Sequence, residues 1–228
     1  LGIGFDQNSS FQKGPALAPN RIRESYFSSS SNLWSEKGLD LGSLHLLYDL
    51  GDIVFKTNAD PFNQITSSAK VVLDQGNHMI CLGGDHSITF PVIKAYAQKY
   101  DSLNILHLDA HPDLYDSLDG NIYSHACPFA RIMEKKLAKR LVQAGIRTMT
   151  GHQREQAKKF GVEVKEMKDG MDWLDELEFD GPVYLSLDLD CLDPAFAPGV
   201  SHHDPGGMTT RQVIDIIQTL GCLNTLMR

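Results

Sequence analysis

The sequence has few cysteines, no basic surplus and no long hydrophobic run. Its four cysteines are widely spaced and form no CxxC pair, which argues against a disulfide framework and favours a reducing compartment. The 21 lysines and arginines are outnumbered by 29 aspartates and glutamates, so the net charge of −8 leaves no basic surface for phosphates. Apolar stretches end well short of the roughly 18 residues that span a membrane. We therefore expect a soluble, cytoplasmic protein that binds neither nucleic acid nor membrane.

The remaining composition predicts a packed α/β fold. Hydrophobic residues make up 42% and charged residues 22% of the chain, as in ordinary globular domains. Short runs rich in Val, Ile and Leu alternate with longer stretches of helical spacing, a pattern typical of a parallel sheet covered by helices on both faces. No repeat or linker divides the chain. We predict a single domain over residues 1–228, a three-layer α/β/α sandwich with a mainly parallel sheet.

The periodicity assigns an approximate range to each element. Strands are predicted over residues 1–5, 46–53, 79–82, 104–108, 140–146, 162–164 and 183–189. Helices are predicted over 21–26, 62–75, 88–99, 128–136, 154–160, 171–177 and 210–220, and a Thr209-Thr210 cap opens the last of them.

A histidine and two aspartates follow the predicted strand 104–108. Asp109, His111 and Asp113 alternate with other residues, so an extended backbone would direct all three to one side. They come at the carboxyl end of the strand, where open parallel sheets bind ligands. His107 lies just before them, either as a core residue or in the outer part of the same site.

Two further clusters follow other predicted strands. Asp188 and Asp190 share a face, and two carboxylates buried side by side need a cation to offset their repulsion and desolvation. The segment GGDHS at 83–87 lies between a strand and a helix, where its glycines permit a tight turn and His86 can reach the same cleft. One such cluster alone is more often a turn or a helix cap. Three clusters at strand ends indicate a metal site.

The donor set indicates the metal and the reaction type. Carboxylates with a little imidazole suit Mn²⁺ better than a structural zinc, which more often recruits thiolates. This number of ligands suits two Mn²⁺ ions better than one. A binuclear site lowers the pKa of a bridging water and so predicts metal-assisted hydrolysis. The expected ligands are His86, Asp109, His111, Asp113, Asp188 and Asp190.

Three segments together resemble the signature blocks of the ureohydrolase family, which includes arginases and agmatinases. They are GGDHS at 83–87, DAHPD at 109–113 and SLDLDCLDPAFAPG at 186–199. The similarity extends to residues 14–23, 120–126 and 201–207. The three blocks occur in the family's order, and the α/β/α sandwich of the family agrees with the strand and helix pattern.

The resemblance implies roles for particular residues. His86, Asp109, Asp113 and Asp188 would hold one manganese ion, and Asp109, His111, Asp188 and Asp190 the other. A hydroxide bridging the two ions would attack the guanidinium carbon of a small guanidino substrate and release urea and an amine. His125 would move protons to the leaving amine, so His125 and the ligand Asp113 are the expected catalytic residues. Family members are usually homo-oligomers, which implies a trimer or hexamer.

The segment that follows the second signature block bears on the substrate. Animal-type arginases bind the α-carboxylate with an Asn at the position that Tyr115 occupies here. The loop over 116–125 more closely resembles agmatinases and plant-type arginases. We expect Tyr115 and Asn121 to contact the substrate, and agmatine is favoured over arginine, which differs from it only by a carboxylate.

Two alternatives remain open. Family members continue after the helix at 210–220 into a strand ending in a Glu that pairs with the guanidinium, whereas no Glu follows Glu178 here. The domain apparently lacks that strand and the closing helices, so the chain could be a truncated, catalytically impaired member that acts as a subunit or partner. The other alternative is a related metal-dependent deacetylase, which would use one zinc and an Asp-His-Asp set. The six ligand positions favour the binuclear site.

Overall fold

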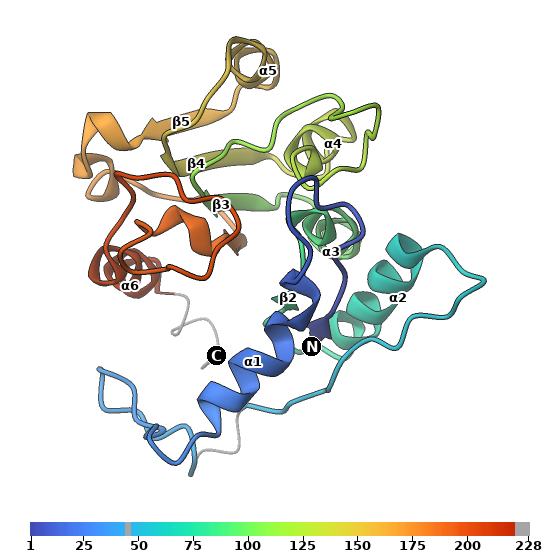
Figure 1. The fold of residues 1–228 in the computed structure, drawn as a ribbon, viewed down its shortest axis with the longest axis vertical. Helices are drawn as coiled ribbons and strands as arrows, with labels where there is room; N and C mark the ends of the chain where they lie inside the picture. The colour runs from blue at the N-terminus through green and yellow to red at the C-terminus, as the bar shows by residue number, and fades with distance from the viewer. Residues whose placement is uncertain (44–46, 222–228) are drawn as a thin grey trace.

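The computed structural model describes residues 1–43 and 47–221, and its strands pair only in parallel within that range (Figure 1). One sheet has the order β1-β2 and the other has the order β5-β4-β3-β6. The strands are β1 (Gly2–Ile3), β2 (Leu82–Gly83), β3 (Asn104–Leu108), β4 (Arg140–Ile146), β5 (Glu163–Glu166) and β6 (Val183–Leu187).

Helices connect the strands, and local capping residues mark where several of them begin and end. In α5 and α6 the N-cap threonines, Thr150 and Thr209, form capping boxes with Gln153 and Gln212. Helix α5 ends at Phe160 and is followed by Gly161, whose φ of 67° suits a residue without a Cβ. The helices are α1 (Ala18–Tyr26), α2 (Pro61–Asp74), α3 (Thr89–Tyr96), α4 (Pro128–Glu134), α5 (Gly151–Phe160) and α6 (Thr210–Thr219).

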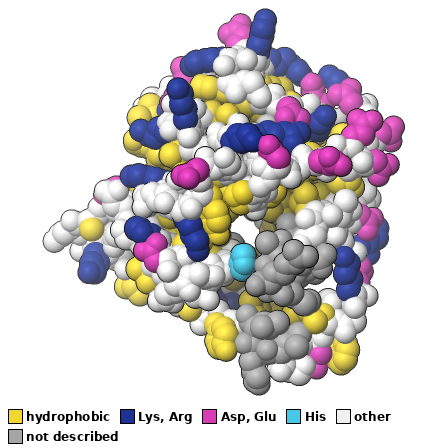
Figure 2. All heavy atoms as spheres, turned by 180° about the vertical axis from the view of Figure 1, so that it is seen from behind, with side chains coloured by type: hydrophobic (Ala, Val, Ile, Leu, Met, Phe, Trp, Pro, Cys, Tyr) yellow, Lys and Arg dark blue, Asp and Glu magenta, His cyan; other side chains and the backbone are white. Residues whose placement is uncertain are grey.

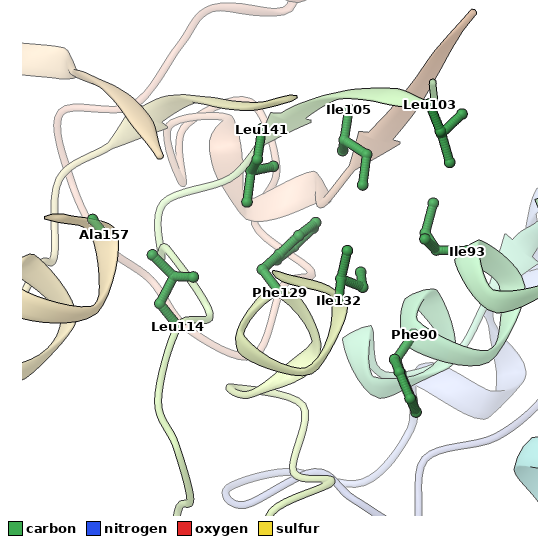
Figure 3. Packing of buried hydrophobic residues seen from close by; sticks show 9 residues of the cluster. All are labelled: Phe90, Ile93, Leu103, Ile105, Leu114, Phe129, Ile132, Leu141 and Ala157. Carbon is green, nitrogen blue, oxygen red and sulfur yellow. The ribbon is translucent and has the colours of Figure 1, made fainter. Parts of the chain in front are cut away.

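Two hydrophobic layers cover the faces of the larger sheet, which makes the architecture a three-layer α/β/α sandwich. On one face, side chains of α3, α4 and α5 pack against β3 and β4, with Phe129 and Ile132 wholly buried (Figure 3). On the other face, Val213 and Ile216 of α6 pack against Leu106 of β3 and its neighbours. Strand β3 is therefore buried along its whole length, as expected for the centre of a parallel sheet.

Two predicted elements are wrong. The strand predicted over 46–53 is absent from its described part, where only Asp52 forms an isolated bridge, to Gly2; residue 46 lies outside the described residues. Arg23 of α1 pairs with Asp49 and Asp52 at 2.7 and 2.6 Å, so these carboxylates hold the segment against a helix. The helix predicted over 171–177 is a 3-10 turn, Asp172–Leu174, because its apolar side chains pack individually onto the sheet.

The helices and the surface bear on what a membrane protein and a binding cleft require. Within the described ranges, no helix combines the length and the apolar character that a membrane span requires. Figure 2 shows basic and acidic side chains intermixed over one face, with a hollow at its centre bordered by hydrophobic side chains and a histidine.

Candidate metal centre

The ligand segments meet because they follow neighbouring parallel strands. Leu108 and Leu187 are register partners at the ends of β3 and β6, so Asp109 and Asp188 come next to each other. The amide of Asp188 donates to the carbonyl of Leu108 at 2.9 Å and fixes this junction. His86 begins the 3-10 turn after β2, and its ring reaches the same edge.

His86 faces three carboxylates. Its Nδ1 lies 3.1, 3.0 and 3.3 Å from carboxylate oxygens of Asp109, Asp113 and Asp188. Despite these short distances, Nδ1 is buried and has no hydrogen-bond partner among the described residues. Its other nitrogen, Nε2, is 3.0 Å from the hydroxyl of Ser186. A buried nitrogen surrounded by carboxylate oxygens, but not hydrogen-bonded to them, has the geometry of a ligand set that a cation completes.

His111 forms a second group of donors around the same aspartate. Its Nδ1 lies 3.3 Å from Asp109 Oδ1 and 3.2 Å from Asp190 Oδ2. The nearest nitrogen and oxygen atoms of His111, Asp109 and Asp190 all lie within 4.8 Å of one another, as do those of His86, His107 and Asp109, although His107 is not among the expected ligands. Asp109 belongs to both groups and is 1% exposed, so it is placed to bridge two ions.

The segment after β3 reaches the site differently from the alternation predicted for an extended strand. Strand β3 ends at Leu108, and residues 109–113 form a loop. Asp113 has a φ of 49°, in the left-handed region that non-glycine residues seldom adopt. This turn, rather than a continued strand, brings the Asp113 carboxylate back to His86. Such strained backbone is common at functional sites.

The carboxylates strongly perturb one another. Burial and the neighbouring Asp109 raise the pKa of Asp113 to about 7. Burial, Asp109 and Asp188 raise the pKa of Asp190 to about 8. Burial alone would lower the pKa of His86, but Asp109, Asp113 and Asp188 raise it well above its ordinary value. So much negative charge in a buried space is relieved by a bound cation, and carboxylate with imidazole donors suits Mn²⁺. The donor set fits a pair of such ions.

His125 lies in the loop before α4, at the same cleft as these ligands. Its Nε2 is 2.8 Å from the hydroxyl of Ser10, in the loop before α1, and its ring stacks on His202 with centroids 5.8 Å apart. His125, Ser10 and His202 line the same large cleft as the six predicted ligands. Burial, followed by the nearby His202 and His86, lowers the pKa of His125 to about 4. The imidazole is therefore neutral at pH 7.

The two predicted substrate-contacting residues lie in different places. Tyr115 lines the metal cleft, where its ring stacks on His152 at 5.8 Å. Asn121 instead lines a second, smaller cavity of about 460 Å³, and its side-chain amide donates to Asn8 Oδ1 at 3.1 Å. The structure therefore does not bring Asn121 to the cleft that the expected ligands line, and its contact with a substrate stays a prediction.

Several residues around the ligands were not predicted. Ser186 contacts His86, and its position two residues before Asp188 on a strand is a signal that could have found it. The sequence analysis gives His202 and Asp204 no role of their own, yet the His202 ring packs against His111 at 5.4 Å and Asp204 contacts its Nε2. His203 points away, to the carbonyl of Pro198. Nothing in the local pattern of residues 201–207 separates His202 from His203.

Comparison with known proteins agrees with this geometry. A family model described as "Arginase family" matches residues 1–227. Arginase 1, mitochondrial, of rice (Oryza sativa subsp. indica) is 46% identical over 235 residues, which cover 96% of this chain and 69% of that protein. N(1)-aminopropylagmatine ureohydrolase of Thermus thermophilus is 39% identical over 153 residues, covering 65% of this chain and 52% of the relative.

The fold of a solved relative is also similar. The structure of arginase from Medicago truncatula superposes with a TM-score of 0.86 at 44% sequence identity and covers 96% of this chain and 73% of that chain. Family model, sequence and fold all agree on the same assignment. This chain belongs to the arginase family, the binuclear metal-dependent ureohydrolases, and is a hydrolase that acts on guanidino compounds.

Proposed function

We propose that this chain binds two Mn²⁺ ions and hydrolyses a small guanidino substrate to urea and an amine. The observation that carries the proposal is the buried Nδ1 of His86, which faces three carboxylate oxygens without a hydrogen bond. When bound, such a pair of ions lowers the pKa of water and supplies a nucleophile at neutral pH. One ion would be held by His86, Asp109, Asp113 and Asp188, and the other by Asp109, His111, Asp188 and Asp190.

Within this proposal the chain's own residues move the protons. His125 is neutral at pH 7 because its pKa is about 4, so its Nδ1, the nitrogen that is not bonded to Ser10, can accept a proton and pass it to the leaving amine. Ser10 holds the imidazole through Nε2 at 2.8 Å. His202 packs against the other side of the ring and restricts its rotation.

Arginine and agmatine are the two candidate substrates. The sequence of the loop before His125 favours agmatine, whereas the relative at 46% identity is named an arginase. We propose arginine as the first substrate to assay, because that similarity extends over 96% of this chain. Tyr115, which lines the cleft, is the residue proposed to contact the part of the substrate in which the two compounds differ.

Urea release tests the proposal. The purified chain is loaded with Mn²⁺ and assayed with arginine, agmatine and guanidinobutyrate in parallel, with His111→Ala as the control and bound manganese measured in each sample. The proposal is supported if wild type releases urea from one of these substrates and His111→Ala does not. No urea from any substrate while two ions are bound would instead support the catalytically impaired subunit.

A further inference from the structure

We infer that Asp204 is a positioning residue for the second metal ion of the proposed site, acting through His111. This inference rests on the proposed metal site. Asp204 Oδ2 lies 3.0 Å from His111 Nε2. The opposite ring nitrogen, Nδ1, lies 3.2 and 3.3 Å from oxygens of Asp190 and Asp109. The two nitrogens of one ring thus face a carboxylate outside the ligand set and two carboxylates within it.

The Asp204 carboxylate decides which nitrogen of His111 is free. An imidazole that binds a metal through one nitrogen carries its single proton on the other, and an acceptor at Nε2 holds that proton there while the Nδ1 lone pair faces the metal. The negative charge of the Asp204 carboxylate also makes Nδ1 a stronger electron-pair donor to a metal ion. The ring of His202 packs edge-on against His111, with centroids 5.4 Å apart and planes at 72°, and so restricts its rotation. Asp204 and His202 thus hold the His111 ring in the orientation that presents Nδ1 to Asp109 and Asp190.

Arg147 fixes the backbone from which Asp204 reaches His111. It follows β4, and its Nε and Nη2 donate to the carbonyl oxygen of Asp204 at 3.0 and 2.7 Å. The same Nη2 donates to the carbonyl oxygen of Asp190 at 2.7 Å. One guanidinium therefore connects the end of β4 to the backbone of a predicted ligand and to that of Asp204. Its planar set of donors suits this role, which the single ammonium of a lysine does not match.

The histidine of the first ion's ligand set, His86, has a different partner at its outer nitrogen. The Nε2 of His86 faces the neutral hydroxyl of Ser186 at 3.0 Å, not a carboxylate. The charged partner is therefore specific to His111. Loss of Asp204 is expected to lower the affinity for the second ion and to leave the affinity for the first ion unchanged.

Stepwise Mn²⁺ titration of the metal-free chain by calorimetry, with electron paramagnetic resonance of the coupled ion pair, tests the inference. Wild type, Asp204→Ala and Asp204→Asn are compared with Asp116→Ala, which removes a carboxylate that pairs with His152 at 3.2 Å on the surface. In Asp204→Ala the second equivalent is expected to bind about 10- to 100-fold more weakly, with the first unchanged. Asp116→Ala is expected to bind both equivalents as wild type does.

The outcomes separate the two proposals. If wild type fails to bind two ions, the proposed function itself is overturned. If wild type binds two ions, equal affinity for the second ion in Asp204→Ala, or equal weakening of both ions, overturns the role of Asp204. Should the alanine variant not fold, Asp204→Asn keeps the shape and removes the charge. This variant is expected to lower the affinity for the second ion by a smaller factor than Asp204→Ala does. An unchanged affinity for the second ion in Asp204→Asn overturns the inference.

Discussion

His107 Nε2 donates a hydrogen bond to Asp109 Oδ2 at 2.7 Å inside the core. The tautomer follows from Gln143, whose Nε2 donates to Pro112 O at 2.6 Å and approaches His107 Nδ1 at 3.0 Å. Because the amide nitrogen only donates, Nδ1 must accept and Nε2 must carry the proton. His107 is thus both a core residue and a partner of the aspartate shared by the two ligand groups.

Replacement of His107 by leucine is expected to weaken metal binding. The change removes the proton donor of Asp109 and leaves a buried carboxylate oxygen without that partner, so Mn²⁺ affinity should fall about 10- to 100-fold. The free energy of unfolding of the metal-free chain should fall by about 1–3 kcal/mol. Calorimetric titration and urea denaturation measure the two effects. Wild-type Mn²⁺ affinity in His107→Leu would show that the contact does not orient Asp109.

His125→Asn is expected to lower kcat by about 100-fold or more, because general acid–base groups contribute about 10²- to 10⁴-fold. The asparagine keeps a polar side chain but cannot take up the proton. Manganese content should not change, since His125 is outside both ligand groups. Steady-state urea production with parallel metal analysis measures both. Ser10→Ala is the companion variant, with a smaller loss of kcat because it only holds the ring. Unchanged kcat in His125→Asn would contradict the proton-transfer role.

Phe129→Ala is expected to destabilise the chain by about 3–5 kcal/mol. Phe129 is 0% exposed and packs between α4 and β3 (Figure 3). Its ring also stacks on His107 with centroids 3.9 Å apart, so a cavity there reaches the site. Urea denaturation gives the stability change, with Phe129→Leu as the milder control. A loss below that of the leucine variant would show that the ring is not a central part of the core.

The ion pair of Arg154 and Glu166 is expected to contribute stability that acid removes. Arg154 lowers the pKa of Glu166 from its ordinary 4.5 to about 2, with Lys168 helping. A depressed carboxyl pKa stabilises the fold above pH 4.5, and this stability is lost as the pH falls toward 2. Because half of the Arg154 side chain is exposed, the contribution is below about 1 kcal/mol.

Urea denaturation of Glu166→Gln and wild type between pH 7 and pH 3 measures this contribution. The stability difference should be largest at neutral pH and shrink below pH 4.5. Glu176→Gln, which also removes one carboxylate but at an exposed position, provides the matched control for the change in charge. A difference between Glu166→Gln and wild type that stays constant over this range would exclude the ion pair as its source.

The meeting of most expected ligands could be predicted because these residues follow strands directly. His86, Asp109 and Asp188 each come at the carboxyl end of a strand, and parallel pairing brings such ends to one edge. Asp113 reaches the site through a left-handed turn that alternation does not predict. Asp204 and Arg147 are 57 residues apart in the chain. Their contact is a product of tertiary packing, which local patterns do not encode.

The same distinction explains the elements that were missed. The segment 46–53 is apolar enough to suggest a strand, but Asp49 and Asp52 bind Arg23 of α1. The segment 171–177 has helical spacing, but its apolar side chains pack onto the sheet from the short 3-10 turn Asp172–Leu174. In both cases a contact or turn outside the periodic pattern determines the local structure.

The number of manganese ions bound per chain tests the binuclear site most directly. After loading and removal of free metal, elemental analysis of wild type should give two Mn²⁺ per chain. Asp109→Asn, which removes the charge at the residue shared by both groups, should give fewer than one. One ion or none in wild type, or two ions retained in Asp109→Asn, would contradict a site built around Asp109.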